Sequence, residues 1–126
     1  MPQVLIDTDI AIDYLRGEEA LLSVMHRLWR ERCAALSVLT VYELTAGMRE
    51  REKSATKNFI AACRILELSP EIAARGGDLY REYRSRGVTL APLDCLIADT
   101  ALEKGFQVAT RNVKHYPQKG ILADLR

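Results

Sequence analysis

Three acidic residues stand out because each lies where a strand pattern ends or a helical pattern begins. Asp7 directly follows the apolar run 4–6, Glu43 lies in the first turns of a helical pattern, and Asp94 comes two residues after Pro92. Carboxylates brought together repel one another unless a cation lies between them, and all-oxygen ligation suits Mg²⁺ or Mn²⁺ better than zinc. Such a cation lowers the pKa of a bound water and orients it toward a phosphodiester. These residues therefore indicate metal-dependent hydrolysis of a phosphate ester.

Alternating strand and helix patterns place these residues in an α/β fold. Short apolar runs predict strands at residues 4–6, 33–36, 65–68 and 106–109, with a further edge strand after residue 117. Apolar residues at helical spacing predict helices over residues 9–15, 21–29, 38–53, 72–87 and 92–104, with another helical face at 59–63. The alternation implies a three-layer α/β/α architecture around a central, mainly parallel sheet of four to five strands. Gly76-Gly77 inside a helix costs about 1 kcal/mol for each glycine relative to alanine, which indicates close helix packing there.

A parallel sheet brings the candidate residues to one edge. Ligands of open parallel sheets bind beyond the carboxyl ends of the strands. The residues that fall there are Asp7, Glu43, Asp94, Thr110 and Asn112. Each carboxylate also has a purely structural interpretation: Asp7 as a helix N-cap, Glu43 as the partner of Thr40 in a capping box, and Asp94 as a charge that complements a helix dipole. The shared edge favours one common site, and such caps are compatible with metal binding.

Composition narrows the classes of protein. The 126 residues suit a single domain over 1–126, and a formal net charge of +1 means that RNA contact needs a local basic patch rather than a globally basic surface. The cysteines at 33, 63 and 95 form no CxxC pair, which argues against a zinc cage and fits a reducing cytoplasm. No apolar run reaches the roughly 18 residues of a membrane span, and the start lacks a basic segment typical of a signal peptide.

Four segments resemble the PIN-domain family, and most closely the VapC-type ribonuclease toxins of prokaryotic toxin–antitoxin pairs. They are LIDTDIAIDYLRG, LSVLTVYELTAGM, PLDCLIADTALEKG and VATRNVKHYP, which occur in the family's order over nearly the whole chain. The resemblance implies a PIN-like fold and a divalent-metal-dependent endoribonuclease that hydrolyses RNA with a metal-activated water. It also implies inhibition by a small, VapB-like antitoxin protein and assembly as a homodimer.

The resemblance assigns roles to individual residues. Asp7, Glu43 and Asp94 match the family's three most regular acidic ligands. The family's fourth acidic position falls on Asn112, which adds no negative charge and puts the strength of the metal site in doubt. Asp99 is a candidate to compensate, although it lies roughly 140° from Asp94 around a helix. The remaining supporting candidates beside the site are Thr8, Asp9 and Thr110.

Basic residues are candidates for contacts with RNA phosphates, which position a strand without reading its sequence. The candidates are Arg16, Arg111 and Lys114, and a solvated surface charge is the alternative for each. Residues 48–53 alternate in charge sign, as exposed helical faces do. In the resembling toxins, helices of this region help to form the antitoxin groove.

Three other classes of protein compete with the nuclease. Asp7 and Asp9 form a DxD at a strand end, as in haloacid-dehalogenase-type phosphatases, where Asp7 would be the nucleophile; those enzymes need a longer core. A receiver-type signalling domain needs a phospho-accepting aspartate after its third strand, and residues 66–70 supply none. The third alternative is a nuclease-dead PIN-like binding scaffold, which the departure at Asn112 keeps open.

Overall fold

A parallel four-stranded sheet forms the centre of the computed structural model, which describes residues 2–125. The strands are β1 (Val4–Ile6), β2 (Ala34–Ser37), β3 (Arg64–Leu66) and β4 (Gln107–Ala109), arranged in the order β3-β2-β1-β4. All three strand pairs are parallel, which confirms the predicted sheet. The tail adds a single parallel bridge between Val108 and Leu122 in place of a full fifth strand.

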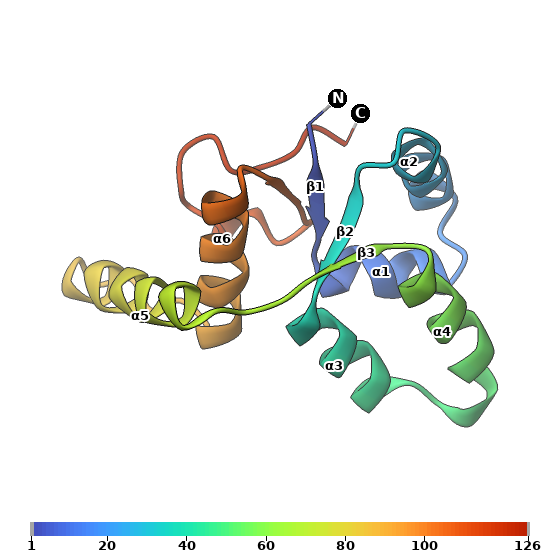
Figure 1. Cartoon of the computed structure of the whole chain (residues 1–126), viewed down its shortest axis with the longest axis horizontal. Helices are drawn as coiled ribbons and strands as arrows, with labels where there is room; N and C mark the ends of the chain where they lie inside the picture. The colour runs from blue at the N-terminus through green and yellow to red at the C-terminus, as the bar shows by residue number, and fades with distance from the viewer. Residues whose placement is uncertain (1, 126) are drawn as a thin grey trace.

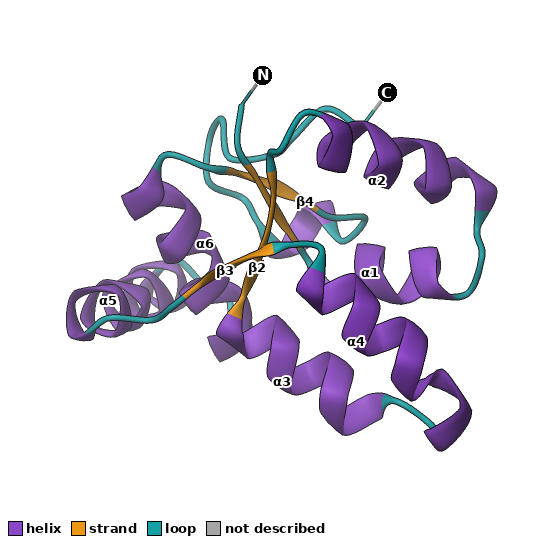
Figure 2. Cartoon of the chain, turned by 45° about the vertical axis from the view of Figure 1, so that its right-hand side comes forward, coloured by secondary structure: helices purple, strands orange, loops and turns teal. Residues whose placement is uncertain are grey.

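Helices cover both faces of the sheet, as the three-layer prediction requires (Figures 1 and 2). They are α1 (Thr8–Leu15), α2 (Glu19–Arg30), α3 (Val38–Gly47), α4 (Lys53–Ala61), α5 (Pro70–Ser85) and α6 (Pro92–Lys104). Two short 3₁₀ turns, η1 (Glu50–Glu52) and η2 (Val113–His115), complete the elements. Figure 1 shows α5 and α6 on one side of the sheet and α1, α2 and α4 on the other. No helix within residues 2–125 is long and apolar enough to cross a membrane.

The central strand β1 joins two hydrophobic cores. Successive side chains of a strand point to opposite faces of the sheet. Val4 and Ile6 accordingly pack into a core with residues of α1, α2 and α4, while Leu5 packs into a second core with residues of α6 and Tyr116. All three β1 side chains are buried, so the strand end is held firmly and the residue that follows it has a well-defined position.

One predicted helix is wrong in its length. The pattern predicts a continuous helix over 38–53, but α3 ends at Gly47 and Met48 has an extended backbone. The alternating charges after Gly47 provide no apolar stripe to hold a helix against the core, and the carboxylate of Glu52 accepts a hydrogen bond from the Arg49 amide at 2.7 Å. This contact starts a new helical segment, η1 followed by α4.

The predicted capping box at Thr40 is also wrong. Ser37 caps α3, with its hydroxyl oxygen accepting a hydrogen bond from the Leu39 amide at 3.0 Å. Thr40 is fully buried within the first turn of the helix. Glu43 therefore has no part in starting α3, and its side chain is free for another contact.

The predicted close packing is confirmed at one glycine of the Gly76-Gly77 pair. A β-carbon on Gly76 would lie 2.9 Å from Leu96 Cδ2 of α6, whereas one on Gly77 would meet nothing within 4 Å. Gly76 therefore lies at a close contact between α5 and α6.

The two glycines should respond differently to substitution. Gly77→Ala is expected to raise the free energy of unfolding by up to about 1 kcal/mol because alanine is the better helix former. Gly76→Ala is expected to gain less, because Leu96 must shift, and Gly76→Val should lower stability. Chemical denaturation at one fixed protein concentration measures all three variants. Equal gains from the two alanine variants would contradict the close packing.

Candidate active site

Asp7 is a buried carboxylate at the carboxyl end of the central strand. The parallel register pairs Ile6 with Ala109, so Asp7 and Thr110 lie side by side as the two strands end. Only 6% of Asp7 is exposed, and the Thr110 hydroxyl donates to its Oδ2 at 2.8 Å while the Thr8 amide donates to its Oδ1 at 2.9 Å. The side chain thus caps α1, which confirms the structural interpretation, and it also lies at the strand ends beside Thr110, where a role in a metal site stays a prediction.

Burial raises the pKa of Asp7 above its ordinary value. The hydrogen bond from Thr110 opposes this effect, whereas the nearby negative charge of Asp9 and the weaker influence of Asp94 raise the pKa further. A carboxylate held among other carboxylates in a partly dry environment is in a costly state unless a positive charge compensates it. The site is electrostatically arranged to accept a cation.

Asp94 approaches Asp7 from the first turn of α6. The hydroxyl of the buried Tyr116 donates to Asp94 Oδ1 at 3.3 Å, and His115 Nδ1 lies 3.1 Å from Asp94 Oδ2. Burial raises the pKa of Asp94, and the neighbouring His115 and the Tyr116 hydroxyl oppose this shift.

The Tyr116 hydroxyl connects the two aspartates. Burial and then the charges of Asp7 and Asp94 raise the pKa of Tyr116 far above its ordinary value, so that its hydroxyl remains a proton donor at any physiological pH. The sequence analysis did not identify His115 or Tyr116 as site residues. Both lie in the segment VATRNVKHYP, three and four residues after Asn112, but their contact with Asp94 depends on the turn η2, which the sequence did not predict.

Thr8 links Glu43 to the same cluster. Its amide donates to Asp7, and its hydroxyl donates to Glu43 Oε1 at 2.8 Å. The hydroxyl also lies 3.4 Å from the Thr40 hydroxyl of α3. One residue at the start of α1 therefore orients two of the three predicted acidic residues, and Thr8 does more than begin a helix.

Asp9 lies beside this cluster, and both of its carboxylate oxygens are occupied. Oδ1 accepts from the Ile10 amide and Oδ2 from the Arg111 amide, each at 2.8 Å. Its charge contributes to the raised pKa values of Asp7 and Asp94. The structure thus places Asp9 on the acidic rim, where it ties the turn after β4 to α1.

A family model for the PIN domain matches residues 4–118. This chain belongs to the PIN-domain family. Among its curated relatives, Ribonuclease VapC19 of Mycobacterium tuberculosis is 42% identical over 115 residues, which cover 90% of this chain and 91% of the relative. Ribonuclease VapC10 of the same species is 35% identical over 114 residues, covering 90% and 86% of the two chains. The family resemblance predicted from the four sequence segments is confirmed.

Solved structures show the same PIN fold. VapBC2 from Rickettsia felis, bound to a DNA fragment from its promoter, superposes with a TM-score of 0.85 at 20% identity and covers 96% of each chain. FitAcB from Neisseria gonorrhoeae gives a TM-score of 0.77 at 25% identity, covering 90% of this chain and 91% of that one. The predicted PIN-like α/β fold is therefore confirmed.

Two predicted members of the PIN site have other surroundings in the structure. Asp99 is buried, and burial raises its pKa. The charge of Glu103 raises this pKa further, whereas that of Arg75 on α5 opposes the shift. Asp99 therefore faces α5 and is not placed to compensate for Asn112. Asn112 itself is exposed, and its backbone N–H donates a hydrogen bond to the Thr110 hydroxyl at 3.0 Å.

The three predicted phosphate contacts are not gathered at the cluster. The Arg111 guanidinium lies 3.0 Å from Asp13 Oδ2 and also pairs with Glu18, which ties it to α1 and the start of α2. Lys114 is exposed on η2, and Arg16 lies beyond the end of α1. Arg111 is thus engaged within the chain and would have to give up two ion pairs to meet RNA.

The donor chemistry of the cluster fits a hard divalent cation. No group of three His, Cys, Asp or Glu side chains among residues 2–125 is close enough to form a ready-made metal cage. Mg²⁺ commonly keeps several waters and uses only one or two carboxylates of the protein. Asp7 and Asp94, whose charges act on each other and on Tyr116, form such a pair, and they supply oxygen ligands alone.

The raised pKa of Asp7 makes a prediction about stability and pH. Because the folded state binds this proton more tightly than the unfolded chain, the ionised carboxylate costs stability at neutral pH, and the cost disappears as the pH falls through the raised pKa. Asp7→Asn removes the charge and keeps the shape. In EDTA at pH 7.5 it should therefore melt at a higher temperature than the parent protein, and the difference should shrink as the pH is lowered.

The matched control is Asp78→Asn, which removes an exposed carboxylate of α5 that pairs with Arg81. This control is expected to bring no stabilisation at pH 7.5. A lower melting temperature for Asp7→Asn than for the parent protein at pH 7.5 would show that the charge of Asp7 is favourable in the fold, contrary to its raised pKa.

Proposed function

We propose that this PIN-domain chain is a divalent-metal-dependent endoribonuclease and the toxin of a toxin–antitoxin pair. The observation that carries the proposal is the proximity of the Asp7 and Asp94 charges at the ligand-binding edge of the sheet, where the buried Tyr116 hydroxyl donates to Asp94 and both carboxylates raise its pKa. Two relatives covering most of the chain are named ribonucleases, which supports the same activity here.

The proposed metal ligands are Asp7 and Asp94, with Glu43 as a further ligand or as the group that orients water. A bound Mg²⁺ or Mn²⁺ would supply positive charge at the phosphate and favour ionisation of an attacking water. The chain's own residues prepare the site for it. Thr110 and Thr8 fix the two oxygens of Asp7, and Tyr116 orients Asp94. Thr8 also holds Glu43, whose carboxylate can accept a proton from the water.

The structure bears on the phosphatase alternative. In that reading Asp9 would be the acid that donates a proton to the leaving group. Both oxygens of Asp9 instead accept hydrogen bonds from backbone N–H groups, which tie the side chain to α1 and to the turn after β4 and leave it in no position to serve a leaving group. The scaffold alternative rests on Asn112, which adds no charge at the fourth acidic position. An assay of RNA cleavage distinguishes an active nuclease from such a scaffold.

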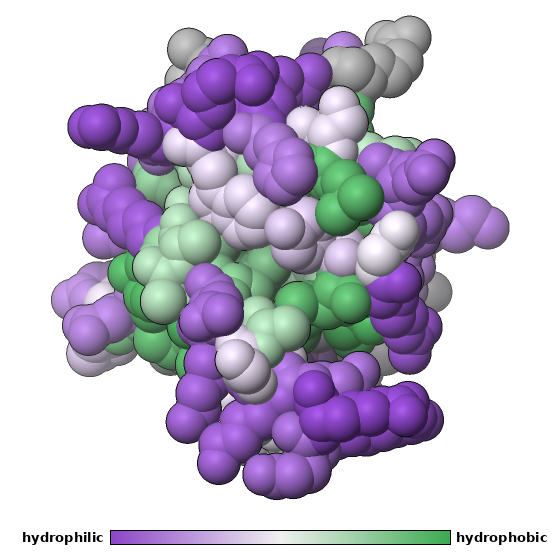
Figure 3. All heavy atoms as spheres, turned by 90° about the vertical axis from the view of Figure 1, so that its right-hand side faces the viewer, coloured by the Kyte–Doolittle hydropathy of each residue, from purple (hydrophilic) through white to green (hydrophobic). Residues whose placement is uncertain are grey.

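The proposed partners are an RNA substrate, a small VapB-like antitoxin and a second copy of the chain. The solved neighbours include toxin–antitoxin complexes, which supports an antitoxin here. An apolar hollow between α1, α2 and α4, lined by Tyr14, Trp29 and Phe59 among others, is a suitable surface for it. Figure 3, which views the molecule from this side, shows apolar side chains between hydrophilic bands. The three free, buried cysteines fit the proposed cytoplasmic location.

Removing either aspartate should abolish cleavage. Asp7→Ala and Asp94→Ala are each expected to lower the rate of RNA cleavage by at least 10³-fold, on the order of the loss of a group that stabilises transition-state charge. The assay is cleavage of total RNA by purified, antitoxin-free protein in Mg²⁺ or Mn²⁺, with EDTA as the metal-free condition. Discrete cuts that need the metal and both aspartates are the expected result.

Asp13→Ala serves as the matched control, because Asp13 is an aspartate of α1 that pairs with Arg111 outside the cluster. It should cleave RNA at the parent rate. Cleavage by Asp7→Ala at the parent rate would overturn the assignment, and a parent protein inactive in both metals would favour the scaffold.

Thr8 should act as a positioning residue. Thr8→Val removes the hydroxyl that holds Glu43 and keeps the side-chain shape, and we expect a loss of 10- to 100-fold in kcat, the usual effect of removing a group that orients a ligand. Thr8→Ser retains the hydroxyl and should restore most of the rate. A comparable loss in both variants, measured with one RNA substrate, would contradict this role.

A further inference from the structure

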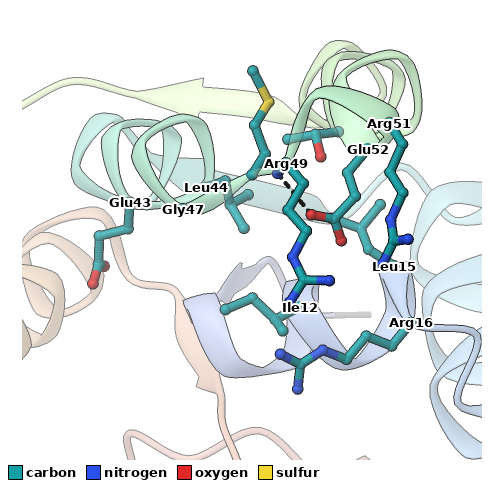
Figure 4. Close-up of a pocket in the computed structure, with 11 residues that line it drawn as sticks. Ile12, Leu15, Arg16, Glu43, Leu44, Gly47, Arg49, Arg51 and Glu52 are labelled. Carbon is teal, nitrogen blue, oxygen red and sulfur yellow. Dashed lines mark hydrogen bonds between the residues drawn. The ribbon is translucent and has the colours of Figure 1, made fainter.

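A groove with three arginines opens beside the acidic cluster. It has a volume of about 310 Å³ and lies between α1, α3 and the segment that joins α3 to α4. Figure 4 shows Arg49 and Arg51 reaching from that segment toward α1, where Arg16 lies beneath them, with Glu43 at one end of the groove. The early end of α3 creates this arrangement, because the extended Met48 carries Arg49 and Arg51 over α1.

The three arginine charges have no ion-pair partner within residues 2–125. By contrast, four arginines elsewhere in residues 2–125 form ion pairs with carboxylates: Arg75, Arg81, Arg86 and Arg111. Two carboxylates also line the groove: Glu43, which accepts from the Thr8 hydroxyl, and Glu52, which accepts from the Arg49 amide. The groove therefore carries one more positive than negative charge, and its guanidinium groups would attract a phosphate placed beside them.

We propose that this groove binds the backbone phosphates of single-stranded RNA next to the scissile bond. The inference rests on the proposed function, because Glu43 belongs to both the acidic cluster and the groove. A strand whose phosphodiester lies at Asp7 and Asp94 would run past Glu43 to the arginines. Guanidinium groups suit this task because they bind phosphate oxygens in a bidentate manner. With a net charge of +1, the chain needs such a local cluster to hold RNA.

The proposal changes the interpretation of residues 48–53. As a continuous exposed helix, their alternating charges would have no common direction. The break at Met48 instead turns Arg49 and Arg51 to the same side as Arg16. Of these three, only Arg16 was expected from the sequence to contact phosphate.

The test is the affinity for a fluorescent single-stranded RNA oligonucleotide, measured by anisotropy in EDTA over a range of salt concentrations. Arg49→Gln with Arg51→Gln is expected to weaken binding about tenfold at low salt. The slope of log K against log salt is about −0.7 for each phosphate contact on a single strand, so losing two contacts should reduce it by about 1.4. Arg81→Gln with Arg84→Gln, which removes the same charge from α5, should leave both values unchanged.

Unchanged RNA affinity and salt slope in Arg49→Gln/Arg51→Gln would overturn the proposal. If the same variant then lost binding to a labelled glutamate-rich peptide, the groove would belong to an acidic protein partner instead. Binding in EDTA does not depend on cleavage, so the nuclease activity and the RNA-binding groove are tested independently of each other. Arginine-dependent binding without cleavage would contradict the nuclease alone, and Asp7-dependent cleavage with unchanged binding would contradict the groove alone.

Discussion

The burial of the Asp7 carboxylate is the constraint on which the rest of the site depends. A charged group that loses water must recover hydrogen bonds, and Asp7 obtains them from the first residue of α1 and the first residue after β4. These two bonds join segments 102 positions apart in the chain, Thr8 and Thr110, at one point of the sheet edge. Because Thr8 also holds Glu43, the bonds that satisfy Asp7 indirectly position a third element, α3.

The site is less stable than it would be without its charges. Burial raises the pKa of both Asp7 and Asp94, and Asp9 adds repulsion to each. Tyr116 relieves part of this cost as a permanent proton donor, but a hydroxyl carries no positive charge. The remaining cost is consistent with the proposed cation site, since the same repulsion between carboxylates would strengthen their attraction for a divalent metal. Stability and function therefore oppose each other in these few residues.

The acidic cluster and the arginines of the groove are held by different parts of the secondary structure. The acidic cluster lies at the ends of strands held in a buried sheet, whereas the three arginines of the groove come from a helix end and an irregular segment. Glu43 lies where the two regions meet. An apolar hollow adjoins the groove through Leu15, which lines both. A protein that covered this side of the molecule would therefore also block the proposed path of the RNA strand.

The sequence by itself determined the α/β class, the four strands and the placement of Asp7 and Asp94, because short apolar runs and helix-starting residues are local signals. It also indicated the close packing at Gly76. It did not reveal the end of α3 at Gly47, since the choice between a continuous and a broken helix depended on whether residues 48–53 had a core to pack against. Nor did it reveal Tyr116 and His115 beside Asp94, or Asp99 facing α5. Those contacts join residues that are distant in the chain or differ by a rotation around one helix, and only tertiary packing decides which side chains then meet.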